Sequence, residues 1–254
     1  MNKYEKNIDC AIYPSLKHKI VLISGGASGI GKSIVEYFCY QNSKVIFLDI
    51  LDDLAYKLIK DLEKKTNNSP IYIKCDLTKI KDLIKCINNI KKKYGYISVL
   101  INNAANDERH TFESVTSEYW DNRISINLKH YFFAIQTCAE QMKKNGGGTI
   151  VNLGSFSWMM NIGGMPCYTT AKSAISGLTK SFARDLGPFN IRVNCVVPGW
   201  IMTKRQLTYW VTPKIKKKQI EKQCIKRLLE PDEIAKAVIF FASDDSSAAT
   251  AQNY

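Results

Sequence analysis

Tyr168 and Lys172 are the first residues in this sequence whose types and spacing suggest chemistry. On a helix, positions i and i+4 lie on one face, so the phenol and the ammonium group point into the same space. A nearby cation favours the phenolate, which lowers the pKa of the phenol and yields a base that works near neutral pH. Many pairs with this spacing lie on ordinary helix surfaces, so the interpretation depends on the elements around the pair.

A serine upstream strengthens that interpretation. The apolar run TIVNLG at 149–154 predicts a strand, and Ser155 follows it directly. A strand in this place would deliver the Ser155 hydroxyl to the rim of a sheet. We therefore expect Ser155, Tyr168 and Lys172 to meet at one edge.

A glycine-rich loop follows the first apolar run, KIVLIS at 19–24, and leads into a helical pattern. Gly25 can make a tight turn, Gly29 lets the backbone approach a diphosphate, and Gly31 allows the helix to pack closely on the strand. The helix N-terminus adds unpaired N–H groups and the positive end of its dipole. This pattern indicates a dinucleotide site, and a glycine-rich turn without a ligand is the alternative.

Asp49 ends the second predicted strand, KVIFLD at 44–49. An acidic residue there can accept hydrogen bonds from both hydroxyls of the adenosine ribose, and it would repel the extra phosphate of NADP. Neither Ser28 nor the residue after Asp49 is a lysine or arginine. The sequence therefore favours NAD over NADP as the cofactor.

The order of the remaining elements predicts the fold. Further strands are expected at 70–76, 96–102 and 191–199. Helical patterns occupy 52–65, 79–93, 117–144, the stretch from Tyr168 to 186, and the stretch from 230 onward. Alternating strands and helices predict an α/β fold, a single Rossmann-like doubly wound parallel sheet with helices on both faces. Ligands bind beyond the carboxyl ends of such strands, and four polar residues fall there: Asp49, Asp76, Asn103 and Ser155.

Composition narrows the remaining possibilities. The chain has 254 residues, 45% of them hydrophobic, and we expect one domain over 1–254 with a lid-like segment at about 200–228. The net charge is +13, but the lysines are spread out and no aromatic-interleaved basic patch occurs, so nucleic-acid binding is not favoured. No apolar run is long enough for a membrane span, and residues 1–13 do not resemble a signal peptide. Eight cysteines without a C-x-x-C pair predict reduced thiols in a cytoplasmic protein and no metal site.

Eight features recur along the chain in a specific order: SGGASGIG (24–31), Asp49, CDL (75–77), NNAA (102–105), Asn127, Ser155, YTTAK (168–172) and VVPGWIMT (196–203). Together they resemble the short-chain dehydrogenase/reductase family over nearly the whole chain. Other segments are similar to the bacterial NAD-dependent sugar 1-dehydrogenases of the D-xylose type: 11–26, NDERHTFESVT (106–116), 119–130, 153–159 and PGWIMTKRQ (198–206). The departures are Ser24 for a usual Thr, Ala105 for a usual Gly, and an end at TAQNY that apparently lacks the last edge strand, which puts a tetramer interface in doubt.

The resemblance implies roles for four catalytic residues. Tyr168 would be the general base, Lys172 would depress the pKa of Tyr168 and hold the nicotinamide ribose, Ser155 would bind the reacting oxygen, and Asn127 would support a water that links Lys172 to solvent. Asp76 and Leu77 would flank the adenine, and Ile201 and Thr203 would contact the carboxamide. The whole set of expected cofactor contacts is Gly25, Ser28, Gly29, Ile30, Gly31, Asp49, Asp76, Leu77, Asn103, Tyr168, Lys172, Pro198, Gly199, Ile201 and Thr203.

The expected reaction is oxidation of the C1 hydroxyl of a cyclic aldose, a D-xylose-like pentose or a related sugar, to an aldonolactone, with hydride transfer to NAD. Candidate sugar contacts are Asn106, Ser155, Trp158, Met159 and Gln206. Trp158 and Met159 could equally pack the loop, as Asn106, Arg109 and His110 could order theirs, and His18 and His130 are expected to be surface or packing residues. Three alternatives stay open: a ketone or 3-oxoacyl reductase, another alcohol or sugar dehydrogenase of the family, and a catalytically idle NAD-binding protein. A homo-oligomer, either a dimer or a tetramer, is expected.

Overall fold

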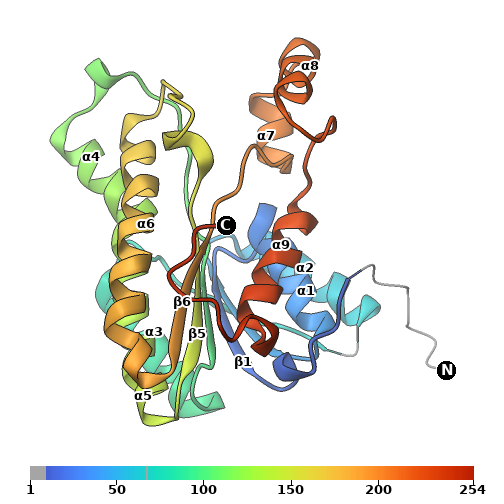
Figure 1. The fold of residues 1–254 in the computed structure, drawn as a ribbon, viewed down its shortest axis with the longest axis vertical. Helices are drawn as coiled ribbons and strands as arrows, with labels where there is room; N and C mark the ends of the chain where they lie inside the picture. Colours follow the sequence, from blue (N-terminus) through green and yellow to red (C-terminus); the bar gives the residue numbers. More distant parts are fainter. Residues whose placement is uncertain (1–9, 67) are drawn as a thin grey trace.

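Six parallel strands form the centre of the protein in the computed structural model, which describes residues 10–66 and 68–254. Their spatial order is β3-β2-β1-β4-β5-β6 (Figure 1), with β1 (Ile20–Ser24), β2 (Lys44–Asp49), β3 (Ile71–Lys74), β4 (Val99–Asn102), β5 (Gly148–Leu153) and β6 (Ile191–Val196). The predicted doubly wound α/β fold is confirmed. The prediction that residues 1–13 are not a signal peptide falls mostly on residues 1–9, which lie outside the described part of the chain.

The order of the strands reverses between β1 and β4, because the chain builds outward from β1 to β3 and then returns to the other side of β1. Val21 of β1 lies opposite Val99 of β4, although the two are far apart in the sequence. In open α/β sheets such a reversal leaves a crevice beyond the carboxyl ends of the two strands, where ligands bind.

Successive residues of each strand point to opposite faces of the sheet, so each strand contributes to two cores. Val21 and Ile23 face one core and Leu22 faces the other. The first core lies under α1 (Gly29–Tyr40), α2 (Asp52–Lys65) and α9 (Pro231–Ala242), and the second lies under α3 (Ile80–Tyr94), α5 (His130–Lys144) and α6 (Pro166–Leu186). Helices therefore cover both faces (Figure 1).

Local sequence explains where several helices begin and end. Asp52 and Asp53 occupy the first turn of α2 and Lys64 and Lys65 the last, which complements the helix dipole. Helix α6 begins with proline at its first position, as fits a backbone that needs no N–H there. Helix α9 begins with a capping box in which the side chains of Glu230 and Glu233 each accept a backbone N–H of the other residue.

The long helix predicted over 117–144 has an irregular centre. Helix α4 (Ser117–Ile124) passes into a π-helical turn at Ser125–Lys129 and then into α5. Asn127 is the fully buried residue of that turn. Such turns insert one extra residue into a helix and are frequent at functional sites.

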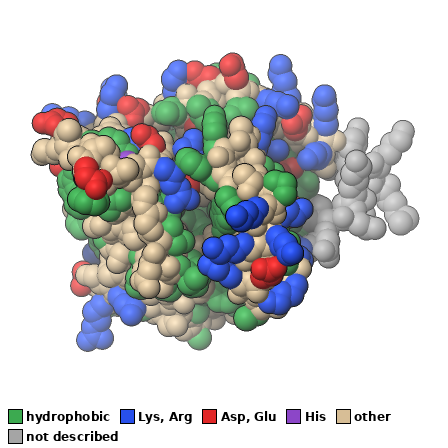
Figure 2. All heavy atoms as spheres, turned by 90° about the horizontal axis from the view of Figure 1, so that it is seen from above, with side chains coloured by type: hydrophobic (Ala, Val, Ile, Leu, Met, Phe, Trp, Pro, Cys, Tyr) green, Lys and Arg blue, Asp and Glu red, His purple; other side chains and the backbone are tan. Residues whose placement is uncertain are grey.

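The segment after β6 projects beyond the carboxyl ends of the strands. It contains α7 (Lys204–Tyr209) and α8 (Pro213–Lys222), and both stand clear of the sheet (Figure 1). A view onto this end of the molecule shows lysine and arginine side chains gathered on the side where α8 projects (Figure 2). Both helices lie within the lid-like segment expected at about 200–228, and the role of that segment as a lid stays a prediction.

Beside β6, residues close to the C-terminus continue the sheet without forming a seventh strand in the described part of the chain. The N–H of Cys195 donates to the Gln252 carbonyl (2.8 Å), and the N–H of Tyr254 donates to the Cys195 carbonyl (2.9 Å). Five of the eight cysteines are buried: Cys39, Cys75, Cys138, Cys167 and Cys195. None of the helices in the described ranges has the length and apolar character needed to span a membrane.

Candidate active site

The four side chains predicted to be catalytic come from three elements that meet at the carboxyl end of the sheet. Tyr168 and Lys172 lie in the first two turns of α6, and Ser155 follows β5 directly. Asn127 enters from the π-helical turn, which packs against α6.

Tyr168 experiences four influences on its phenol. Burial raises the pKa of Tyr168 to about 12, a hydrogen bond with Ser155 lowers it, the negative charge of Asp107 raises it, and the positive charge of Arg109 lowers it. Ser155 and Tyr168 therefore lie close together at one edge of the sheet, and their catalytic roles stay predictions. Ser155 Oγ donates to Ser157 Oγ (3.0 Å) and accepts the Ser157 N–H (3.2 Å), so the turn after β5 holds the Ser155 side chain in place.

Lys172 is 2% exposed and lies beneath Tyr168. Its Nζ donates to the Leu153 carbonyl at 2.7 Å and to the Tyr131 hydroxyl at 3.1 Å, and it lies 5.8 Å from the centroid of the Tyr168 ring. Burial lowers the pKa of Lys172 to about 7. The ammonium nitrogen is thus anchored on the end of β5, where it faces the aromatic ring of Tyr168.

Tyr131 was not identified from the sequence. It is fully buried, and its hydroxyl donates to the Leu153 carbonyl at 3.1 Å while accepting from Lys172. The signal was its position four residues after Asn127, which places both side chains near one helix face. The apolar surroundings of Tyr131 in the sequence hid that signal.

Asn127 binds the loop that follows β4. Its Oδ1 accepts the Asn106 N–H at 2.8 Å, and its Nδ2 donates to the carbonyls of Asn106 (3.2 Å) and Arg123 (3.0 Å). The amide therefore holds the backbone beside the site in place. Its predicted role toward a water near Lys172 stays a prediction.

The glycine loop has the geometry that a dinucleotide requires. Gly25 and Gly29 have positive φ angles of 69° and 56°, which residues with a side chain rarely adopt. A Cβ at Gly31 would overlap the Gly25 carbonyl and come within 2.5 Å of Asn103 Nδ2. Ser28, the residue before α1, does not cap the helix with its side chain, so the first N–H groups keep their capacity to bind phosphate.

Asp49, 8% exposed, lies beside this loop at the end of β2. Its carboxylate accepts the N–H groups of Ala27 (2.9 Å), Ile50 (2.8 Å) and Leu51 (3.1 Å). These bonds fix a negative charge where the adenosine ribose of a bound dinucleotide would lie. The residues present fit NAD in this respect.

The remaining cofactor candidates lie around the same edge. Asn103 donates from Nδ2 to the carbonyls of Ser24 (3.0 Å) and Gly25 (2.9 Å), so its side chain holds the glycine loop. Asp76 Oδ1 accepts the N–H (3.0 Å) and hydroxyl (2.7 Å) of Thr78, which lower the pKa of Asp76. The other candidates border these groups in the same loops or in the segment after β6: Ile30, Leu77, Pro198, Gly199, Ile201 and Thr203.

Among the candidate sugar contacts, Trp158 has a buried indole N–H with no hydrogen-bond partner. A buried donor left unpaired is costly, which makes this N–H a candidate partner for a ligand hydroxyl. Met159, beside it, is 43% exposed. The Asn106 side chain accepts the Glu108 N–H at 3.0 Å, and Gln206 is held by Asp107 and Trp200.

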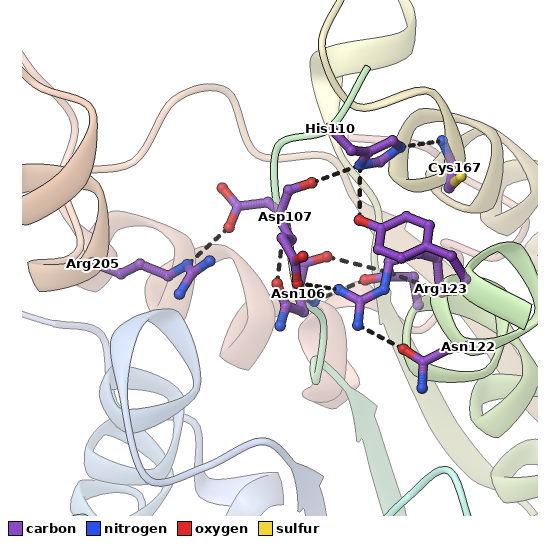
Figure 3. A network of polar contacts seen from close by, with 10 residues as sticks. Asn106, Asp107, His110, Asn122, Arg123, Cys167 and Arg205 are labelled. Carbon is purple, nitrogen blue, oxygen red and sulfur yellow. Dashed lines mark hydrogen bonds and ion pairs between the residues drawn. The ribbon is translucent and has the colours of Figure 1, made fainter. Parts of the chain in front are cut away.

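A polar network around the loop after β4 was not predicted in this extent (Figure 3). Arg123, 7% exposed, donates to Glu108 Oε2 at 2.9 Å. His110 accepts the Cys167 N–H at 3.3 Å, one residue before Tyr168, and contacts the Tyr119 hydroxyl at 3.0 Å. The network ties the loop to α4 and to the start of α6, which agrees with the loop-ordering role considered for His110.

Two other features lie apart from the reacting groups. A cavity of about 560 Å³ between β3 and α3 includes Asp76 in its lining but none of the four predicted catalytic residues. His130 is buried, and burial together with the charge of Lys172 lowers the pKa of His130 to about 4. Over residues 10–66 and 68–254, no group of three or more His, Cys, Asp or Glu side chains could hold a metal ion.

Comparisons with known proteins agree with this geometry. Residues 25–254 match the family described as Enoyl-(Acyl carrier protein) reductase. A D-xylose 1-dehydrogenase from Caulobacter vibrioides is 44% identical over 244 residues, which are 96% of this chain and 96% of that protein. A probable galactose dehydrogenase from Rhizobium meliloti is 42% identical, with 94% of each chain covered. The ligand-free structure of Thermoplasma acidophilum aldohexose dehydrogenase has a TM-score of 0.83 and 31% identity, and the match covers 95% of this chain and 93% of that one.

Proposed function

Because the chain belongs to the short-chain dehydrogenase/reductase family, we propose that it oxidises the C1 hydroxyl of a cyclic aldose to an aldonolactone with NAD. The observation that carries the proposal is the meeting of Ser155, Tyr168 and Lys172 at the end of β5. The turn that Ser155 begins ends at Trp158, whose buried indole N–H has no partner. The names of the similar sugar dehydrogenases support an aldose, either a D-xylose-like pentose or a related sugar, as the substrate class.

Tyr168 accepts the proton of the anomeric hydroxyl. The Ser155 hydroxyl turns from Ser157 and donates its one proton in a hydrogen bond to the same oxygen. Bound NAD supplies the hydride acceptor and a positive charge close to the phenol. The pKa of Tyr168 is raised to about 12 by burial, so the phenolate needs positive charge near it to form at neutral pH. Lys172, held under the ring by Leu153 and Tyr131, provides such a charge from the protein when protonated.

NAD is favoured over NADP by Asp49. Its carboxylate is fixed by three backbone N–H groups beside the loop, where it accepts ribose hydroxyls and repels a 2′-phosphate. The positive φ angles of Gly25 and Gly29 support a tight loop that a diphosphate can approach. We further propose a cytoplasmic enzyme that assembles as a homo-oligomer.

Tyr168→Phe tests the assignment of the base. The variant keeps the ring but loses the group that takes the proton, so turnover should fall by about 10² to 10⁴-fold. NAD binding, measured by calorimetry, should persist. Retained turnover in this variant would remove Tyr168 from the mechanism.

A substrate panel tests the reaction. We expect NADH formation with pentoses or hexoses, and much less with NADP or with simple alcohols. Activity confined to NADPH and a ketone would instead identify a reductase. Binding of NAD without turnover on any substrate of the panel would identify a catalytically idle protein.

A further inference from the structure

Helix α7 is held against the loop after β4 by both oxygens of a single carboxylate. Asp107 Oδ1 accepts from Arg205 Nε at 3.0 Å, and Asp107 Oδ2 accepts from Gln206 Nε2 at 2.6 Å. Figure 3 shows Arg205 reaching from α7 toward Asp107, which lies next to Asn106 in the loop. Two adjacent residues of α7 thus meet one residue that lies about a hundred positions earlier in the sequence.

Two further contacts extend this connection. Gln206 Oε1 accepts the indole N–H of Trp200 at 2.7 Å, so Gln206 links Asp107 to the segment that precedes α7. At the other end of α7, the guanidinium of Arg109 lies 5.4 Å from the ring centroid of Trp210. The loop at 107–109 therefore contacts α7 at both of its ends.

These contacts matter because α7 has little else to fix it. It is six residues long and has no buried residue. Helices this short are not stable alone in water, so tertiary contacts determine where α7 lies. The backbone bridge between Ile201 and Leu229 holds the base of the segment, but α7 itself meets the loop through Asp107 and Arg109.

We propose that Asp107 is a positioning residue that docks α7 over the substrate site and thereby sets the place of Gln206 and Trp210. The proposal rests on the proposed function in one respect, namely that the space under α7 receives the sugar. Asp107 acts through α7 and makes no contact with the reacting atoms in this account.

The size of the contribution follows from burial. The Arg205 side chain is 48% exposed, and an exposed ion pair contributes little alone. The Asp107 side chain is only 19% exposed, and both of its oxygens are used in charge-assisted bonds, which are stronger than neutral ones. Loss of the negative charge should therefore lower the equilibrium constant between docked and undocked α7 by about tenfold.

The charge of Asp107 also reaches the catalytic phenol. It raises the pKa of Tyr168, so its removal lowers that pKa and lets the phenolate form at lower pH. If Asp107 only docks α7, its loss should raise the KM for the sugar and leave the pH profile of turnover unchanged. If its charge also acts on Tyr168, its loss should shift that pH profile as well.

Asp107→Asn tests the proposal, because it keeps the shape of the side chain and removes the charge. Amide hydrogen exchange over 204–210, measured at short labelling times, should accelerate by about tenfold. The KM for the sugar should rise about tenfold while the KM for NAD stays unchanged, and the pH profile of turnover should shift to lower pH. Glu36→Gln is the matched control, since Glu36 is 15% exposed in its side chain and paired with Lys65 at 2.7 Å on α1 and α2.

Arg205→Gln is a second variant that leaves the loop intact, and it should give a smaller change in the same direction. Exchange over 204–210 that matches the control in both variants would overturn the proposal, whatever the activity. This readout needs no turnover, so it separates the two proposals. Inactivity of the unmodified protein toward all sugars would contradict the proposed function. The exchange experiment would then still decide whether Asp107 holds α7 in place.

Discussion

Lys172 places its ammonium nitrogen between the Leu153 carbonyl and the Tyr131 hydroxyl, without a carboxylate at ion-pair distance among the described residues. Burial lowers the pKa of Lys172 to about 7, from an ordinary 10.5. Between these values the unfolded chain holds a proton at this position that the folded chain lacks. The free energy of unfolding therefore rises with pH across this window.

Lys172→Met should remove this pH dependence. The buried cysteines, whose pKa values are raised, act in the opposite direction in both proteins, so we expect the thermal midpoint of the unmodified protein to rise between about pH 7 and pH 10 relative to that of the variant. The Leu153 carbonyl keeps the Tyr131 hydroxyl as a partner in the variant, so no buried acceptor is abandoned. Thermal unfolding in a series of buffers measures both slopes, and equal slopes would contradict a depressed pKa for Lys172.

Trp158 offers a second test at the scale of one residue. Trp158→Phe keeps an aromatic ring in the turn at Phe156–Trp158 and removes the unpartnered N–H. If that N–H binds a sugar hydroxyl, the KM for the sugar should rise about threefold to tenfold, the value of one neutral hydrogen bond. Trp120→Phe, on α4 and 39% exposed, is the control. An unchanged KM would assign Trp158 to packing alone.

The sequence could indicate site residues only where a local motif marks them. Tyr168, Lys172 and Ser155 follow from helical spacing and from the end of a strand, and the structure brings them together. Asp107 carries no such motif, and the spacing of Tyr131 from Asn127 was the one local signal for Tyr131. Their roles come from contacts with Lys172 and Arg205, which are distant in the sequence, and no local pattern encodes those contacts.

Among the elements, two helical glycines give opposite predictions for the same substitution. A Cβ at Gly31 in α1 would overlap the Gly25 carbonyl, whereas a Cβ at Gly177 in α6 would meet no atom within 4 Å. Gly31→Ala should lower the free energy of unfolding by about 1–3 kcal/mol and weaken NAD binding, because the loop must shift. Gly177→Ala should raise it by about 0.5–1 kcal/mol.

Chemical denaturation measures both glycine variants, and calorimetry with NAD measures binding. Equal stability changes in the two variants would show that the packing of α1 on the glycine loop is not tight. The third-glycine role predicted from the sequence, close packing of helix on strand, would then be wrong.

The elements themselves were largely predictable, because apolar runs and helical periodicity are local properties. All six strands lie within or beside the runs that predicted them. The π-helical turn at Ser125–Lys129 was not predictable, since it depends on what Asn127 meets in the folded protein. The Asn127 side chain makes two hydrogen bonds to the Asn106 backbone in the loop after β4, and these bonds stabilise the irregular turn.

For the whole molecule, an aromatic pair on the outer surface bears on assembly. Phe132 on α5 is 41% exposed, and its ring lies 5.2 Å from that of Phe182 on α6. Exposed aromatic surface of this kind is enriched at protein interfaces. We expect a mass in solution that is two or four times 28.8 kDa, and Phe132→Glu should reduce it. Light scattering after gel filtration measures both, and a monomer would contradict the expected homo-oligomer.

The pairing of β1 with β4 has a kinetic consequence. Within the groups β1 to β3 and β4 to β6, each strand pairs with a strand that is next to it in the sequence. The contact between Val21 and Val99 instead joins residues that are separated by two strands and three helices. Contacts between distant residues close large loops and form slowly. The crevice at the reversal exists only after the two halves have joined, so a dinucleotide that contacts both halves should bind the joined state more tightly than either half alone. NAD added during refolding should therefore trap chains at this last step, and in the native protein it should slow the separation of the two halves.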